Sequence, residues 1–200
     1  MKKTFVSFFI IFFTSFSFAQ KIVSGFYEVG LSLAYDSSTN TISGYFEDHT
    51  GWDEETKAPR FSCVFYIEGT ALNNHIIKIK TYHPLYKNED LIIGTLEILD
   101  STMVKVQLPD DHGGCWNVQH FTEEPVSFKL ENRFNWIQIR YVENKKSWFY
   151  SDKKRRTMSY VIKGDPVCVE KIENGWAYCS YFGNKTTKGW LLLSDLNKIQ

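Results

Sequence analysis

The sequence has no excess of charge of either sign, because 23 lysines and arginines balance 23 aspartates and glutamates. This balance removes any global electrostatic reason to expect a nucleic-acid partner. There is no CxxC pair, no cysteine and histidine set with zinc spacing, no Gly-x-Ser-x-Gly and no glycine-rich phosphate loop. No segment after the first nineteen residues approaches the length of a membrane span. We therefore expect no metal, no cofactor and no transmembrane segment in the mature chain.

Aromatic side chains, in contrast, are abundant, at 16% of all residues. Such side chains fill the pleated, half-buried surface of a sheet, so their number favours β-structure. Almost every segment beyond the first nineteen residues alternates apolar and polar positions with period two, and none sustains a helical period. The sequence therefore predicts an all-β protein.

The first nineteen residues have the organisation of a secretory signal peptide. Two lysines precede an apolar run at 5–13, and the small residues Ser17 and Ala19 stand at positions −3 and −1 before Gln20. The alternative is an uncleaved membrane anchor, but the apolar run is short for a span of ~20 residues. We predict cleavage after Ala19 and export to the periplasm or the extracellular space.

Export changes the interpretation of the four cysteines, because an even number in an oxidising compartment suggests disulfides. Pairing by proximity gives Cys63–Cys115 and Cys168–Cys179, which is one of three possible connectivities. If the valines that flank Cys168 face a core, Cys168 itself faces outward. The second bridge then requires Cys179 to share that outward face.

Short strands separated by turn residues predict a first domain at 20–133. Seven or eight antiparallel strands fit a closed barrel or a sandwich, and their up-and-down order favours the barrel. The polar stretch 47–59 is predicted to be a long loop. The ranges expected to form strands are 26–35, 41–46, 61–67, 75–82, 91–99, 103–108, 116–121 and 126–130.

The remaining residues, 134–200, form a second predicted domain with motifs of its own. Lys-Gly-Asp-x-Val-x-Val at 163–169, Asn-Gly-Trp at 174–176 and Lys-Gly-Trp-x-x-x-Ser-Asp-Leu at 188–196 follow one another. In this order they resemble the bacterial SH3-like domains that are appended to many exported bacterial proteins. The resemblance implies a small β-barrel that binds or targets, with peptidoglycan or peptides as frequent ligands. It rests on Gly164, Asp165, Val167, Val169, Gly175, Trp176, Gly189, Trp190 and Leu196.

The cysteines of the second domain are not part of that family pattern. The first domain, with its Phe-Ser-Cys and His-Gly-Gly-Cys-Trp segments, resembles exported proteins to which no activity can be attached. The resemblance therefore gives an expectation of binding for the second domain alone.

Three segments carry residue types that are used in catalysis or metal binding. His112 beside Cys115 could form a thiolate nucleophile, but a disulfide at Cys115 would remove it. The acidic stretch 48–55 could supply oxygen ligands to calcium, although it lacks the ligand spacing and turn glycine of the helix–loop–helix site. Ser151 and Lys154 match the Ser-x-x-Lys of penicillin-binding proteins, whose companion motifs are absent.

Aromatic and basic residues of the second domain predict a ligand-binding surface. Trp148, Phe149 and Tyr150 are consecutive, and successive side chains of a strand alternate faces, so they cannot all point inward. A basic run at 153–156 adjoins them, and a nearby hairpin adds two more rings. The alternative is that these rings seal the small core or the domain interface. The expected ligand-binding residues are Trp148, Phe149, Tyr150, Lys153, Trp176 and Tyr178.

These observations support two functions of different classes. The first is an exported, non-enzymatic binding protein of the cell envelope that takes a peptide, glycan or protein partner. An inhibitor or immunity-type protein that blocks a wall-degrading enzyme is one specific form of it. The second is an envelope hydrolase whose catalytic groups lie in the first domain and whose SH3-like domain localises it. The lack of a convincing catalytic motif makes the binding protein the preferred hypothesis.

Overall fold

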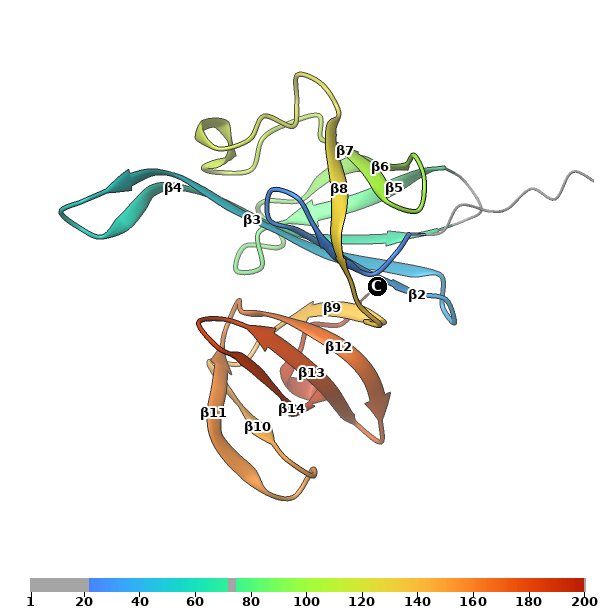
Figure 1. The fold of residues 1–200 in the computed structure, drawn as a ribbon, viewed down its shortest axis with the longest axis vertical. Coiled ribbons are helices and arrows are strands. Elements are labelled where there is room, and N and C mark those ends of the chain that lie inside the picture. The colour runs from blue at the N-terminus through green and yellow to red at the C-terminus, as the bar shows by residue number, and fades with distance from the viewer. Residues whose placement is uncertain (1–21, 72–74, 200) are drawn as a thin grey trace, which may run out of the picture.

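The computed structural model describes residues 22–71 and 75–199, in which two β-sheets follow one another along the chain (Figure 1). The predicted signal peptide and its cleavage site lie outside the described residues. The helices within the described residues are single 3-10 turns of three residues each, and none is long and apolar enough to cross a membrane.

The first sheet is a closed barrel of eight antiparallel strands that lie side by side in chain order. The last strand pairs with the first and completes the ring. This confirms the all-β class, and it confirms a barrel rather than a sandwich for the first sheet. The strands are β1 (Gly25–Tyr27), β2 (Leu31–Asp36), β3 (Thr41–Asp53), β4 (Ala58–Thr70), β5 (Ile76–Tyr82), β6 (Ile92–Ile98), β7 (Met103–Gln107) and β8 (Val126–Arg133).

The prediction of one strand at 26–35 is wrong, because the chain turns between β1 and β2. Val29 and Gly30 have φ values of 54° and 76°, in the left-handed region. A Cβ at Gly30 would clash with the carbonyl oxygen of Glu47, so glycine is needed there. A β-branched residue such as Val29 seldom adopts positive φ, and the sequence therefore gives little sign of this turn.

The predicted loop at 47–59 is instead the outer part of a long β-hairpin. β3 and β4 are thirteen residues each and stay in register from Thr41↔Thr70 to Asp53↔Ala58. In Figure 1 this hairpin projects to the left, beyond the rest of the barrel. We call residues 48–62 the arm. Both faces of the arm are exposed or half-buried, so its strands lack the apolar alternation that marks a strand packed on a core.

The strand predicted at 116–121 is also wrong. The chain there forms η1 (Cys115–Asn117) and then a loop, within a segment at 109–125 that we call the η1 loop. The disulfide Cys63–Cys115 joins this loop to β4, which confirms the first predicted bridge. Gly114, at φ 87°, allows the loop to approach the backbone of Ser62 closely. Phe121 then enters the barrel core, with its ring 5.1 Å from that of Phe46.

The second sheet has six strands in the order β11-β10-β14-β13-β12-β9. Its core is built of small and medium apolar side chains around the ring of Phe149. A short turn, η2 (Leu193–Asp195), follows the last strand, and Leu196 then bridges to Val142. The strands are β9 (Gln138–Tyr141), β10 (Lys146–Tyr150), β11 (Arg156–Ile162), β12 (Pro166–Glu173), β13 (Trp176–Phe182) and β14 (Thr186–Leu192).

The two sheets pack against each other through β9, which lies between them in Figure 1. The Tyr66 hydroxyl donates to the Ile139 carbonyl at 2.6 Å, and the Ile139 N–H donates to Ser43 Oγ at 2.7 Å. Around these bonds the rings of Phe134 and Trp136 stack at 4.3 Å. Polar and apolar contacts therefore hold the barrel and the second sheet together.

The predicted bridge between Cys168 and Cys179 is wrong, because the two thiols lie on opposite faces of the second sheet. Cys168 pairs across the ladder with Ser180, and Cys179 pairs with Val169. Cys179 belongs to the core of the second sheet, whereas Cys168 belongs to the interface with the barrel. Both are free and buried, and burial raises the pKa of each thiol.

Candidate functional site

The candidate site lies on the face of the second sheet that points away from its core, which we call the outer face. Phe149 is 1% exposed and belongs to the core of the second sheet. Its prediction as a ligand-binding residue is therefore wrong. Its neighbours Trp148 and Tyr150 point to the outer face, as strand alternation requires. The other rings of this face are those of Tyr160, Trp176, Tyr178 and Trp190.

Five side chains form a row across five strands of the outer face. The ladder register pairs Arg156 with Tyr150, Tyr150 with Trp190, Trp190 with Tyr178 and Tyr178 with Lys171. Directly opposed residues on one face of a sheet are close enough for their side chains to touch. The rings of Tyr178 and Trp190 accordingly meet edge to face at 5.3 Å. The result is a row of three rings with a cation at each end.

A second group of rings and cations adjoins this row on the β10–β11 hairpin. Trp148 and Tyr160 are opposed across the ladder, with ring centroids 5.2 Å apart. The Lys146 ammonium lies 3.6 Å from the Tyr160 centroid and 4.2 Å from that of Trp148. Arg156 lies 4.7 Å from the Trp148 ring. Cation–π attraction favours these positions of the two charges on the surface.

Lys153, the basic residue predicted for the site, lies over Trp190 at 4.0 Å. Lys171 approaches the same ring at 5.0 Å. Both ammonium groups pair with Glu173, at 2.7 and 3.1 Å, and hydrogen bonds from both lysines lower the pKa of its carboxyl. The predicted Trp176 completes this group, with its ring 4.9 Å from that of Tyr150.

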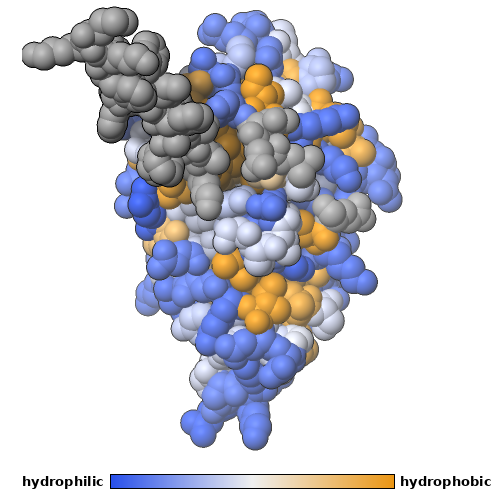
Figure 2. All heavy atoms as spheres, turned by 90° about the vertical axis from the view of Figure 1, so that its right-hand side faces the viewer, coloured by the Kyte–Doolittle hydropathy of each residue, from blue (hydrophilic) through white to orange (hydrophobic). Residues whose placement is uncertain are grey.

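The β10–β11 hairpin and its flanks carry an excess of positive charge, although the whole chain is neutral. Residues 143–163 contain seven lysines and arginines against two acidic residues, a net charge of +5. Figure 2 shows the lower end of the molecule, where the turn between β10 and β11 lies, as hydrophilic. The outer face can therefore attract an anion and place flat groups against its rings.

Four of the six predicted ligand-binding residues lie together on the outer face, namely Trp148, Tyr150, Trp176 and Tyr178. Lys153 lies over the ring of Trp190 on the same face, whereas Phe149 lies in the core. Sequence reasoning missed Tyr160 as a surface ring, Trp190 as a nearly buried ring of the same face, and Lys146 and Lys171 as cations that contact these rings. Arg156 belongs to the predicted basic run, but its contact with Trp148 was not predicted. Tyr160 alternates with the buried Val161, which is a signal that could have identified it. The place of Lys171 depends on an irregular register after Val169, for which the sequence gives no signal.

His112, which was considered as the partner of a Cys115 thiolate, lies in the barrel and not at the outer face. Its Nδ1 is 2.7 Å from Asp90 Oδ2 and its Nε2 is 2.8 Å from Thr81 Oγ1. This has the connectivity of a hydroxyl–imidazole–carboxylate triad. Thr81 is fully buried, however, and His112 is 2% exposed, so no substrate carbonyl can reach the hydroxyl. Burial also lowers the pKa of His112, against the opposing effect of Asp90.

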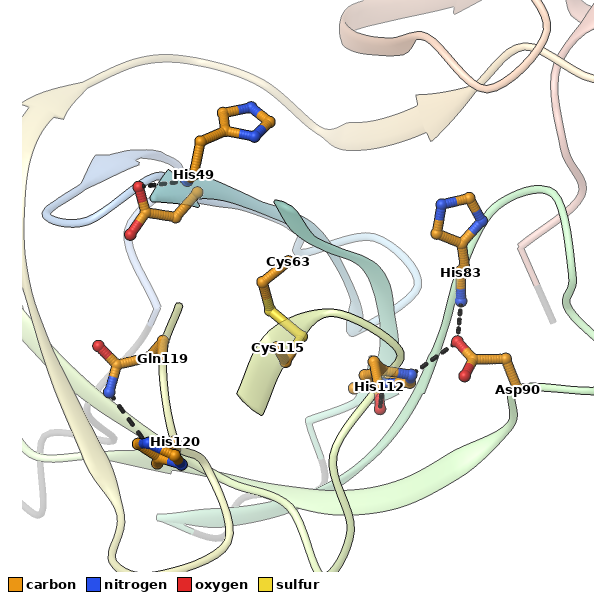
Figure 3. Close-up of a disulfide and its surroundings, with 10 residues drawn as sticks. His49, Cys63, His83, Asp90, His112, Cys115, Gln119 and His120 are labelled. Carbon is orange, nitrogen blue, oxygen red and sulfur yellow. Dashed lines mark hydrogen bonds and ion pairs between the residues drawn. A yellow bond between two sulfur atoms is a disulfide. The ribbon is translucent and has the colours of Figure 1, made fainter. Parts of the chain in front are cut away.

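These contacts anchor the η1 loop to the barrel. Figure 3 shows His112 beside Asp90, whose carboxylate also accepts the His83 backbone N–H at 2.7 Å. The His112 ring stacks on Phe65 at 4.9 Å. Cys115 is bonded to Cys63, so the thiolate nucleophile considered for this loop is not formed.

The acidic stretch considered for calcium uses its carboxylates within the arm. Asp53 accepts the backbone N–H groups of Glu55 and Thr56 and pairs with Arg60 at 2.8 Å. These hydrogen bonds lower the pKa of Asp53. Within residues 22–71 and 75–199, no three histidine, cysteine or acidic side chains are placed to hold a metal ion.

Comparison with known proteins gives no match to a protein-family model, to a curated protein or to a solved structure. The function proposed below therefore rests on the geometry of the outer face and on the sequence motifs.

Proposed function

We propose that this protein is an exported, non-enzymatic binding protein of the cell envelope, and that the outer face of its second sheet binds peptidoglycan. The observation that carries the proposal is the row of three rings with Arg156 and Lys171 at its ends. Peptidoglycan is an extended polymer whose peptide stems carry carboxylates. Its charged groups suit the cations, and its sugar rings suit the aromatic surface.

The sequence motifs of the second domain support the same ligand. Their resemblance to bacterial SH3-like domains implies a wall or peptide ligand, and export, predicted from the leader, would bring the protein to the wall. The positive charge of the β10–β11 hairpin adds long-range attraction toward an anionic polymer.

Co-sedimentation with isolated peptidoglycan tests the proposal. The mature chain, from Gln20, should sediment with the polymer at 150 mM salt, and Tyr150→Ala should weaken binding about thirtyfold, as expected for an aromatic hot spot. Tyr86→Ala is the matched control, because Tyr86 is an exposed tyrosine on the barrel, 54% exposed. Equal binding by the two variants would contradict the assignment of the outer face.

Basic residues of the outer face should differ in their effect. Lys153 is already paired with Glu173, whereas no carboxylate lies within ion-pair distance of Arg156 among the described residues. Arg156→Ala should therefore weaken binding more than Lys153→Ala, and both effects should shrink at high salt. Displacement of the protein by a glycan-free acidic peptide would instead identify a peptide ligand.

A further inference from the structure

The arm and the η1 loop expose three large aromatic rings that neither the barrel core nor the outer face uses. Trp52 is 60% exposed, Phe61 is 41% exposed and Trp116 is 61% exposed. The register pairs Thr50 with Phe61 and Trp52 with Pro59, so alternation places Trp52 and Phe61 on the same face of the arm. We call Trp52, Phe61 and Trp116 the arm rings.

The disulfide brings the η1 loop, which carries the third ring, to the base of the arm. Cys63 lies two residues after Phe61 and therefore points to the same side of β4. It is bonded to Cys115, which directly precedes Trp116. Figure 3 shows this bond between β4 and the η1 loop, and in Figure 1 the loop lies above the base of the arm. Phe61 and Trp116 are thus close in the chain to the covalent link between the arm and the η1 loop, and Trp52 lies further out on the arm.

Hydrogen bonds restrain the arm beneath these rings. Thr50 Oγ1 donates to the Asn117 carbonyl at 2.8 Å, which ties the arm to the η1 loop a second time. At the tip, Asp53 accepts two backbone N–H groups and pairs with Arg60. Restraints already present in the free protein lower the conformational entropy that is lost when a partner binds. Exposed tryptophans on such a restrained surface have the properties of interface hot spots.

The charge around the arm rings indicates which kind of partner would bind there. The segments 47–60 and 109–125 contain nine acidic residues against two basic ones, a net charge of −7. The two basic residues, Lys57 and Arg60, already pair with Glu54 and Asp53. This surface would repel an anionic lipid headgroup or an anionic glycan, and it would attract a positively charged face.

We propose that the arm rings and their acidic surroundings form a second binding surface, which docks a basic protein. The rings supply the apolar centre of the interface, and the acidic residues supply a complementary rim that speeds association. This surface is separate from the outer face, whose β10–β11 hairpin carries an excess of positive charge. The protein would thus connect an anionic polymer to a cationic protein.

Binding to defined probes tests the proposal. The probes are lysozyme and cytochrome c, two small basic proteins, and α-lactalbumin, an acidic protein of the lysozyme fold. At 150 mM salt the mature chain should bind at least one basic probe and leave α-lactalbumin free. Trp52→Ala and Trp116→Ala should each weaken that binding about tenfold or more. Because both side chains are exposed, neither change should lower the thermal midpoint.

Matched controls separate a specific interface from general attraction between charges. Glu55→Lys, at the arm tip, should weaken binding, whereas Glu143→Lys, which changes an exposed acidic residue in the connection between β9 and β10, should not. The proposal is overturned if neither basic probe binds, if α-lactalbumin binds equally, or if the tryptophan variants bind as the wild type does. Self-association of the free protein that is lost in Trp52→Ala would assign the surface to a second copy instead. The probes contain no peptidoglycan, so this test and that of the outer face can fail independently.

Discussion

Removal of the Cys63–Cys115 disulfide should lower the stability of the protein by a large and calculable amount. The bridge closes a sequence separation of 52 residues. The chain-entropy relation gives about 4 kcal/mol for a loop of that length, and the midpoint of thermal unfolding should fall by about 8–16 °C for a chain of this size. The double variant Cys63→Ala/Cys115→Ala is preferred, because serine would place two hydroxyls at fully buried positions.

The measurement is urea unfolding of the oxidised mature chain and of the double variant. Their free energies of unfolding are compared with the same value of m, the dependence of that free energy on urea concentration. The η1 loop should also loosen, because the His112 contacts and the Thr50–Asn117 bond would remain as its main tethers. A loss of less than about 1 kcal/mol would refute the idea that the bridge restricts the unfolded chain. So would the recovery of Cys63 and Cys115 as free thiols from exported protein.

Three further outcomes follow from buried groups. Thiol titration of the exported protein should detect almost no reaction in the native state and two thiols after denaturation, because Cys168 and Cys179 are both free and buried; four would contradict the disulfide. Burial holds the pKa of His112 below that of the unfolded chain, so its contribution to stability is complete above about pH 6.5 and is lost as pH falls. The free energy of unfolding should therefore fall more between pH 7.5 and pH 5.5 in the wild type than in His112→Gln. An equal fall in both proteins would contradict this. Tyr66→Phe leaves the Ile139 carbonyl without its buried donor and should cost about 1–2 kcal/mol in urea unfolding, whereas no loss would mean that the bond between the sheets is unimportant.

The barrel could be predicted because most of its strands have one buried and one exposed face. β5 is typical, with Ile77 and Ile79 buried and Lys78 and Lys80 exposed. Period-two alternation in the sequence identifies only strands that have one buried and one exposed face. The arm has no buried face, so its strands looked like a loop. At 116–121 the alternation was misleading, because the disulfide and Phe121 hold that segment against the barrel as an irregular loop.

The candidate site was only partly predictable for a similar reason. Alternation at 148–150 requires that some of the three rings face outward, but it does not say which. The choice depends on the position of the second core, and the structure places Phe149 there. Likewise, Cys168 does face away from that core, as expected, yet the barrel covers it. Contacts between strands far apart in sequence decide such cases, and a single sequence does not contain them.

The most direct test of the outer face uses the six tryptophans of the chain as reporters. In NMR spectra of the mature protein, soluble peptidoglycan fragments should shift the indole N–H signals of Trp148 and Trp176, which are half-buried on the outer face. The signal of Trp136, which is 2% exposed and lies between the two sheets, should stay in place, as should those of Trp52 and Trp116 on the arm surface. Shifts confined to Trp52 and Trp116, or no shift at any of the six, would contradict the assignment of peptidoglycan binding to the outer face.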